Sequence, residues 1–141
     1  MSLPLMIAGA AFSFYGRIKA AEKEADMLRD KSILLQRSAQ DILDLNEENA
    51  EATRVEIREI SGSAATKFAQ SGFGVDMDSL ADIASAGAKE ISIKTKQAER
   101  EASMRRLEAS YHQRNAGNIR KTAMISGTGA ILGAVSGSFG E

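Results

Sequence analysis

The chain has 141 residues, with 18 Lys and Arg, 19 Asp and Glu, a single His and no Cys. The absence of cysteine excludes thiol catalysis, disulfide scaffolds and cysteine zinc clusters, and one histidine is too few for an imidazole-based metal or acid-base site. Balanced charge argues against a dedicated nucleic-acid-binding protein. Because no phosphate-binding loop, nucleophile elbow or dinucleotide fingerprint occurs, we expect no enzymatic activity, no metal and no cofactor.

Alanine dominates the apolar residues and indicates slim helices. Within the 43% hydrophobic fraction, 23 residues are Ala, whereas only three are Val and five are Phe. Few β-branched and aromatic residues disfavour a sheet, and alanine buries little area, so the core is expected to be thin. We therefore predict an all-α fold of long helices that pack closely through small side chains.

The chain begins with an uncharged segment, residues 1–16, which precedes a predicted first long helix over residues 17–70. No glycine or proline occurs from Arg17 to Ser61, and helix-forming residues fill this stretch. Small and apolar residues recur there at alternating three- and four-residue steps, which is typical of a coiled-coil seam. They are Ile18, Ala21, Ala25, Leu28, Ser32, Leu35, Ala39 and Ile42, after which the seam weakens to Asn46, Asn49 and Thr53.

Residues 71–79 predict a tight turn between two helices. Gly72 and Gly74 can supply a positive φ there, and Asp76, Asp78 or Ser79 can cap the helix that follows. A second long helix is predicted over residues 80–122, and small residues dominate its seam. The seam residues are Leu80, Ala84, Gly87, Ile91, Ala98, Ala102, Ala109, Ala116, Ile119 and Ala123.

These elements predict a long antiparallel helical hairpin, similar to a coiled coil, in which residue i lies opposite about residue 146 minus i. Residues 89–121 hold nine basic and four acidic residues, and the opposing residues 25–57 hold four basic and eight acidic ones. A basic arm thus faces an acidic arm, which favours this pairing modestly.

The hairpin also brings two uncharged Gly- and Ala-rich segments together, residues 1–16 and 123–140. The first segment is too short to be a confident lone membrane span, and Gly129, Gly133 and Gly137 of the second form a stripe that allows close helix packing. Because such an end is unfavourable in water alone, we expect oligomerisation or lipid contact. The candidate contact residues are Leu5, Ile7, Phe12, Phe14, Tyr15, Ile125, Gly129, Ile131, Leu132, Gly133, Gly137 and Phe139.

The layout resembles a known family. An Ile-Ala-Gly-Ala-Ala-Phe start at residues 7–12, an Ile-Ser-Gly-Ser-Ala-Ala segment at 60–65 and the Gln-Ser-Gly-Phe-Gly-Val-Asp-Met-Asp-Ser segment at 70–79 occur in order, followed by a small-residue tail over 123–141. This arrangement is similar to that of the smallest internal core protein, or ejection protein, of T7-like short-tailed phages.

The resemblance implies a non-enzymatic virion component that is stored near the portal and expelled with the genome. In the host envelope it would form homo-oligomers and join other ejection proteins in a conduit for DNA delivery, with envelope lipid contacting the apolar ends. The alternative is a structural helical adaptor that forms a ring on a portal or tail without membrane activity. Non-specific DNA contact through the basic arm is a further, weaker expectation.

Overall fold

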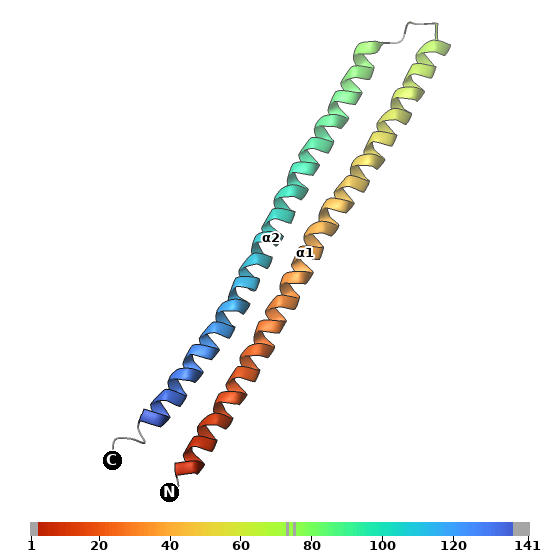
Figure 1. Cartoon of the computed structure of the whole chain (residues 1–141). Coiled ribbons are helices and arrows are strands. Elements are labelled where there is room, and N and C mark those ends of the chain that lie inside the picture. The colour runs from red at the N-terminus through yellow and green to blue at the C-terminus, as the bar shows by residue number, and fades with distance from the viewer. Residues whose placement is uncertain (1–2, 73, 75, 137–141) are drawn as a thin grey trace. The chain divides into compact units, whose positions relative to one another are not determined.

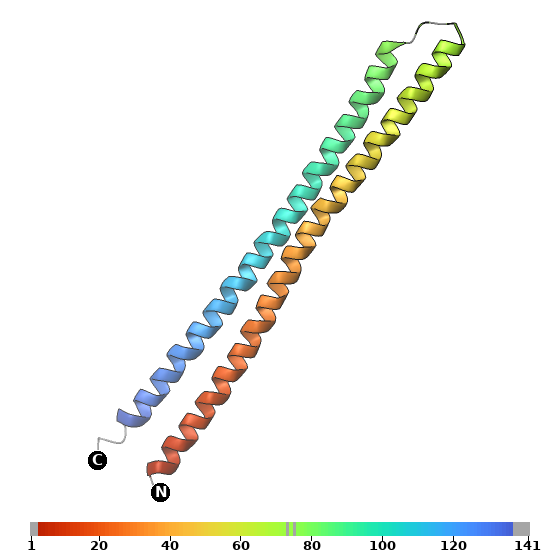
Figure 2. The ribbon, with the colours of Figure 1, turned by 45° about the vertical axis from the view of Figure 1, so that its right-hand side comes forward.

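The computed structural model contains two long helices, α1 over Leu3–Gln70 and α2 over Met77–Ser136, within the residues it describes. It describes the backbone of residues 3–72, 74 and 76–136, and the side chains of residues 12–72, 74 and 76–129. The two helices pack against each other side by side and antiparallel (Figures 1 and 2). The predicted all-α hairpin is therefore confirmed at the level of two packed helices.

Both helices are longer than their predicted counterparts. The predicted first helix begins at residue 17, whereas α1 begins at Leu3 and takes in most of the uncharged segment. Pro4 does not prevent this because it lies in the first turn, where its missing N–H has no helical partner to lose. The predicted second helix ends at residue 122, whereas α2 extends to Ser136 because the small residues beyond Thr122 are compatible with a helix.

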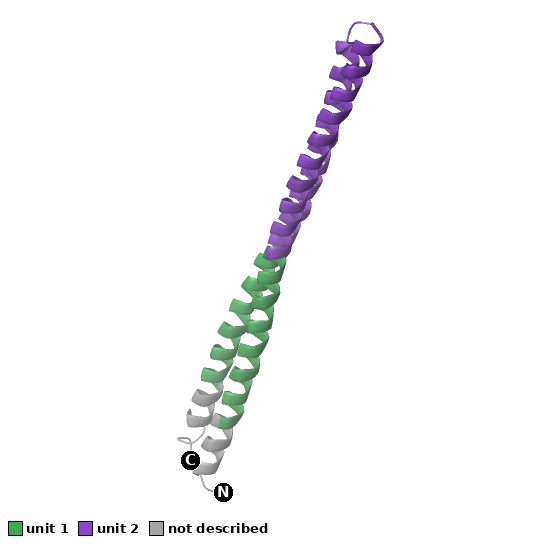
Figure 3. Ribbon diagram, turned by 90° about the vertical axis from the view of Figure 1, so that its right-hand side faces the viewer, with its two compact units in different colours: residues 1–36, 107–141 green, residues 37–106 purple. Residues whose placement is uncertain are grey.

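The chain divides into two compact units, shown in Figure 3. Unit 1 consists of residues 1–36 and 107–141, and unit 2 consists of residues 37–106. Each unit contains a segment of α1 packed on a segment of α2. The interhelix turn belongs to unit 2, and the two chain ends belong to unit 1.

The turn is closed by local hydrogen bonds. The Ser71 N–H donates to the Lys67 carbonyl over 3.1 Å, and the Ser71 hydroxyl donates to the Phe68 carbonyl over 2.9 Å. Gly72 follows with a φ of 71°, a conformation that favours glycine. Gly74 does not share this conformation, so of the two predicted turn glycines only Gly72 is required by its backbone.

Asp76 is the residue that caps α2. Its Oδ1 accepts hydrogen bonds from the N–H groups of Asp78 and Ser79, over 3.2 and 3.4 Å, and its Oδ2 accepts one from the Ser79 hydroxyl over 2.6 Å. These two N–H groups would otherwise lack a helical partner. Of the three predicted capping residues, Asp76 therefore performs this role.

The core between the helices is built from very small side chains. Among the described residues, the fully or nearly buried positions contain no large side chain. They are Ala25, Ser32, Ala39, Ala50, Ala102, Ala109 and Ala116, together with Gly127. Leu28, Leu35 and Ile42 are only half-buried beside them. The thin core expected from the alanine content is thus present.

Two predicted seam positions are wrong. Asn49 is exposed and Ala50 is buried in its place, because the steps from Ile42 to Asn46 and from Asn46 to Ala50 are both of four residues. On α2, Ala84 is exposed while Ile83 is half-buried. Seam residues spaced by steps of four, four and three residues stay on one face of an almost straight helix more closely than those of a strict seven-residue repeat do.

Candidate functional site

The two uncharged segments meet in unit 1. The Phe14 ring of α1 covers Gly127 of α2 so closely that a methyl group at Gly127 would overlap the ring. Gly127 is buried and Phe14 is half-buried as a result. Glycine therefore makes room for an aromatic ring at this level, and the contact joins the regions that flank the two chain ends.

Large apolar side chains around this contact remain in solvent. Phe12 and Tyr15 on α1 are 85% and 66% exposed, and Ile125 on α2 is 72% exposed. Met124 is also exposed. We call Phe12, Tyr15, Met124 and Ile125, with the Phe14–Gly127 pair, the apolar end. Nothing among the described residues covers these four side chains, so a contact with lipid or protein would bury them.

Basic residues border the apolar end. The adjoining stretches of unit 1, residues 12–22 and 109–129, contain five basic residues, Arg17, Lys19, Arg114, Arg120 and Lys121, and one acidic residue, Glu22, which lines the same hollow as Met124. Of these five, only Arg120 forms an ion pair with a described residue, donating from Nη2 to Asp26 Oδ1 over 2.7 Å. An exposed apolar surface next to unpaired cations favours the interface of an anionic membrane.

The remaining predicted contact residues are described less completely. The backbones of Leu5 and Ile7 lie in α1 and those of Ile131, Leu132 and Gly133 lie in α2, but their side chains fall outside the described residues. Gly129 is exposed, with open space where a side chain would stand. Gly137 and Phe139 lie outside the described residues.

Polar residues that the sequence pattern did not place there also occupy the seam of α2, among them Thr95, Arg105 and His112. His112 is half-buried, its Nε2 lies 3.6 Å from Glu108 Oε1, and its Nδ1 is buried without a hydrogen-bond partner. The Arg105 Nε is likewise buried and unpartnered, while its Nη2 donates to Glu101 over 3.2 Å. The heptad spacing from Ala98 and Ala102 was the signal that could have found both positions.

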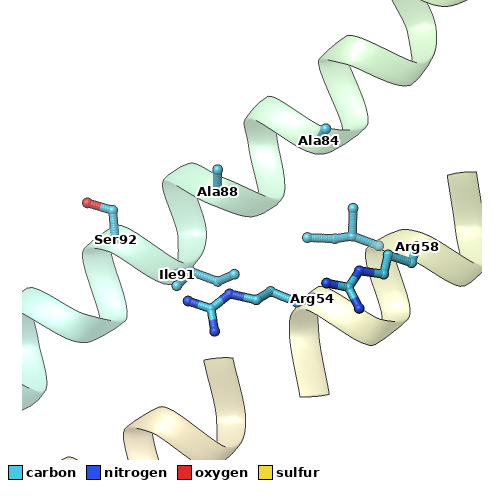
Figure 4. A pocket seen from close by; sticks show the side chains of 7 residues that line it. Arg54, Arg58, Ala84, Ala88, Ile91 and Ser92 are labelled. Atoms are coloured by element: carbon cyan, nitrogen blue, oxygen red, sulfur yellow. The ribbon is translucent and has the colours of Figure 1, made fainter. Parts of the chain in front are cut away.

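Unit 2 contains an open groove of about 430 Å³ between its helix segments, shown in Figure 4. Its sides include Ile57 and Ile91, and Arg54 and Arg58 lie beside each other on the α1 side. Gly87 allows Ile57 to approach α2 closely, because a methyl group at Gly87 would overlap the Ile57 side chain. Arg54 pairs with Glu51 over 3.1 Å. The groove is open, and its lining includes one hydroxyl, that of Ser92, with no histidine or carboxylate among the lining residues to act as its base.

The part of the chain that the structure describes contains no cluster of three or more acidic or histidine residues suited to a metal ion. Among the same residues, neither helix combines the length and the hydropathy that crossing a membrane requires.

Comparison with known proteins adds no assignment: no protein-family model matches the chain, and neither does any curated protein or solved structure.

Proposed function

We propose that this protein is a non-enzymatic membrane-contacting component of a virion, an ejection protein that enters the host envelope with the genome. The observation that carries the membrane contact is the apolar end with its basic border. Exposed aromatic and aliphatic side chains at one end of unit 1 lie close to five basic residues, of which Arg120 pairs with Asp26, and to one acidic residue, Glu22. The location in a virion and the role in a DNA conduit are proposed only from the resemblance of the sequence layout to the ejection-protein family.

The physical mechanism is interfacial insertion. Phe12, Tyr15 and Ile125 enter the boundary between headgroups and acyl chains, where aromatic rings are favoured, and Arg17 and Lys121 remain at the phosphate level. Each cation near an anionic surface contributes about 1 kcal/mol. Several copies assembled with other ejection proteins would then form the wall of a conduit for DNA. The contact of this wall with the DNA would be non-specific.

Vesicle flotation tests the proposal. We expect the full chain to float with vesicles that contain anionic phospholipid, and the floated fraction to fall as salt is raised, because screening weakens the cationic contribution. A chain that stays at the bottom of the gradient with anionic vesicles at low salt contradicts membrane contact. That result would leave the alternative adaptor, a ring on a portal or tail whose apolar ends bind protein.

A further inference from the structure

The part of α2 that belongs to unit 1 has a second regular pattern on the side away from the seam. The seam of this segment runs through Ala109, His112 and Ala116. Exposed residues recur between these positions at alternating four- and three-residue steps, so they form one face that points away from α1. We call it the outer face of α2, and its residues are Leu107, Tyr111, Arg114, Asn118, Lys121 and Ile125.

Apolar and basic side chains make up most of the outer face. Leu107 and Ile125 are 75% and 72% exposed, and Tyr111 is 61% exposed. Neither Arg114 nor Lys121 forms an ion pair with a residue that the structure describes. Both cations are therefore free to bind an external anion, and apolar side chains that remain in solvent lie next to them.

The outer face itself contains no acidic residue. Within residues 107–129 the single acidic residue is Glu108, which lies about 100° around the helix from Leu107 and reaches toward His112 on the seam side. From α1, Asp26 and Glu22 approach α2 at Arg120, which is not part of the outer face. The outer face thus has a net positive charge.

The exposed side of α1 differs in charge. Residues 17–36 contain five basic and four acidic residues, and Asp30 lies between Met27 and Leu34 on the side away from the seam. Apolar side chains are exposed on both helices of unit 1, but only on α2 do they form a face free of acidic residues.

We propose that the outer face of α2 binds an anionic phospholipid surface, so that unit 1 lies flat on the membrane instead of standing on the apolar end. Leu107, Tyr111 and Ile125 enter the boundary between headgroups and acyl chains, and Arg114 and Lys121 bind lipid phosphates. This inference rests on the membrane contact proposed above and extends it along α2 from Ile125 to Leu107.

The length of the outer face separates the two orientations. Leu107 and Ile125 lie about 27 Å apart along the helix axis at 1.5 Å per residue. An interfacial helix buries its apolar face only about 5–10 Å deep. Insertion of the apolar end by an upright unit 1 would therefore leave Leu107 and Tyr111 in water, whereas lying flat buries them together with Ile125.

Charge and hydropathy together favour lipid as the partner. Lipid phosphates neutralise Arg114 and Lys121, and the adjoining acyl chains bury Leu107 and Ile125. Duplex DNA would also neutralise the cations, but its phosphate backbone offers no apolar surface to aliphatic side chains. The outer face is also continuous with the apolar end, because Ile125 belongs to both.

A matched pair of charge variants of the full chain tests the outer face. The outer-face variant combines Arg114→Gln and Lys121→Gln, and the control combines Lys31→Gln and Lys23→Gln, which remove two exposed cations from α1. Each control residue lies at the level of its counterpart, because the two residue numbers add up to a value between those of the facing pairs Phe14–Gly127 and Asp26–Arg120.

Binding is measured with vesicles of equal parts phosphatidylcholine and phosphatidylserine. We expect the outer-face variant to bind at least about tenfold more weakly than the unmodified chain, because each cation near an anionic surface contributes roughly fivefold in affinity. The control should remain within about threefold, since its cations face away from the lipid and are screened by salt. Circular dichroism verifies that both variants keep the helical hairpin.

A single introduced tryptophan reports which side of unit 1 meets the lipid, because the chain contains none. Tyr111→Trp places it on the outer face of α2, and Leu34→Trp places it on the exposed side of α1 at the same level. The replaced side chains are similarly exposed, at 61% and 63%. With vesicles of the same headgroups and brominated acyl chains, we expect strong quenching for Tyr111→Trp and little for Leu34→Trp.

Three results would overturn the outer face as the membrane-binding surface. They are equal vesicle binding by the two charge variants, equal quenching of the two tryptophans, and loss of duplex DNA binding in the outer-face variant with its vesicle binding unchanged. The last result would assign the face to nucleic acid.

Failure of this inference is distinguishable from failure of the proposed function. An unmodified chain that binds no vesicles would contradict both. Vesicle binding that Phe12→Ser with Tyr15→Ser weakens, but the outer-face variant does not, would reject the flat orientation and leave membrane contact through the apolar end standing.

Discussion

Asp76 shows how a single carboxylate fixes the start of α2. The Ser79 hydroxyl, the Ser79 N–H and the Asp78 N–H donate to it, and together they lower its pKa below the ordinary value of 3.8, against a smaller opposing effect of desolvation. The lowered pKa means that the folded state favours the ionised cap. Its contribution to stability is therefore complete above about pH 3.8 and is lost as the pH falls through the lowered pKa.

The Asp76 cap gives a pH-dependent prediction. Asp76→Asn keeps a side-chain oxygen that can cap but cannot ionise, so we expect the variant to melt a few degrees below the unmodified chain at about pH 7. The difference should shrink toward zero when the pH is lowered well below 3.8, because both caps are then neutral. Thermal melts followed by circular dichroism measure it, and a difference that is the same at both pH values would contradict this role.

Glycines within α2 differ in what surrounds them, and alanine substitution separates them. Gly117 has open space where a Cβ would stand, so Gly117→Ala should stabilise the chain by up to about 1 kcal/mol through helix propensity. Gly87 is covered by Ile57, so Gly87→Ala must displace that side chain and should lose part or all of the same gain. Urea unfolding compares the two, and equal stabilisation would show that Ile57 does not restrict Gly87.

The helices illustrate what a sequence pattern specifies and where it stops. Glycine and proline positions were sufficient to predict two helices and a turn at Gly72, because breakers and caps act locally. The seam was predicted correctly through Ile42, but Asn49 was placed in it by extending a seven-residue repeat. The choice between Asn49 and Ala50 depends on how the two helices wind around each other, which a single helical pattern does not determine.

A single helical pattern likewise does not predict which polar residues enter the seam. His112 and Arg105 lie half-buried in the seam, although charged and imidazole side chains are usually solvated. The opposing helix leaves space at those levels, since buried Ser32 and Ala39 are small. A larger side chain on one helix is thus accommodated by a smaller one on the other, a complementarity that appears only when both helices are aligned.

Close packing through alanine is testable at one position. Ala102 is 1% exposed in the seam, so Ala102→Leu has to separate the helices or strain its rotamer and should destabilise the chain by about 1–3 kcal/mol. Ala86→Leu on the exposed side of α2 has similar helix propensity and should cost little. Chemical unfolding measures both, and a neutral Ala102→Leu would mean that the seam is not closely packed.

Across the whole molecule, the distribution of charged residues along the chain was a better guide to the fold than the net charge. The near-zero net charge hides an acidic α1 segment, a basic α2 segment and an uncharged pair of ends. The Phe14–Gly127 contact brings the flanks of those ends together as the hairpin geometry predicted. Helix periodicity does not specify whether lipid or protein covers Phe12, Tyr15 and Ile125, because either can bury an exposed apolar surface.

Flotation of a matched pair of variants tests the membrane contact most directly. Phe12→Ser, Tyr15→Ser and Ile125→Ser together remove exposed side chains of the apolar end while leaving the Phe14–Gly127 contact intact. The control combines Leu45→Ser, Met77→Ser and Ile93→Ser, which are exposed side chains of unit 2. Full burial of a large apolar side chain is worth roughly 1.5–3 kcal/mol, so even partial insertion of three predicts at least tenfold weaker binding to anionic vesicles for the first variant. The control should bind like the unmodified chain, and equal binding by all three proteins would contradict membrane contact through the apolar end.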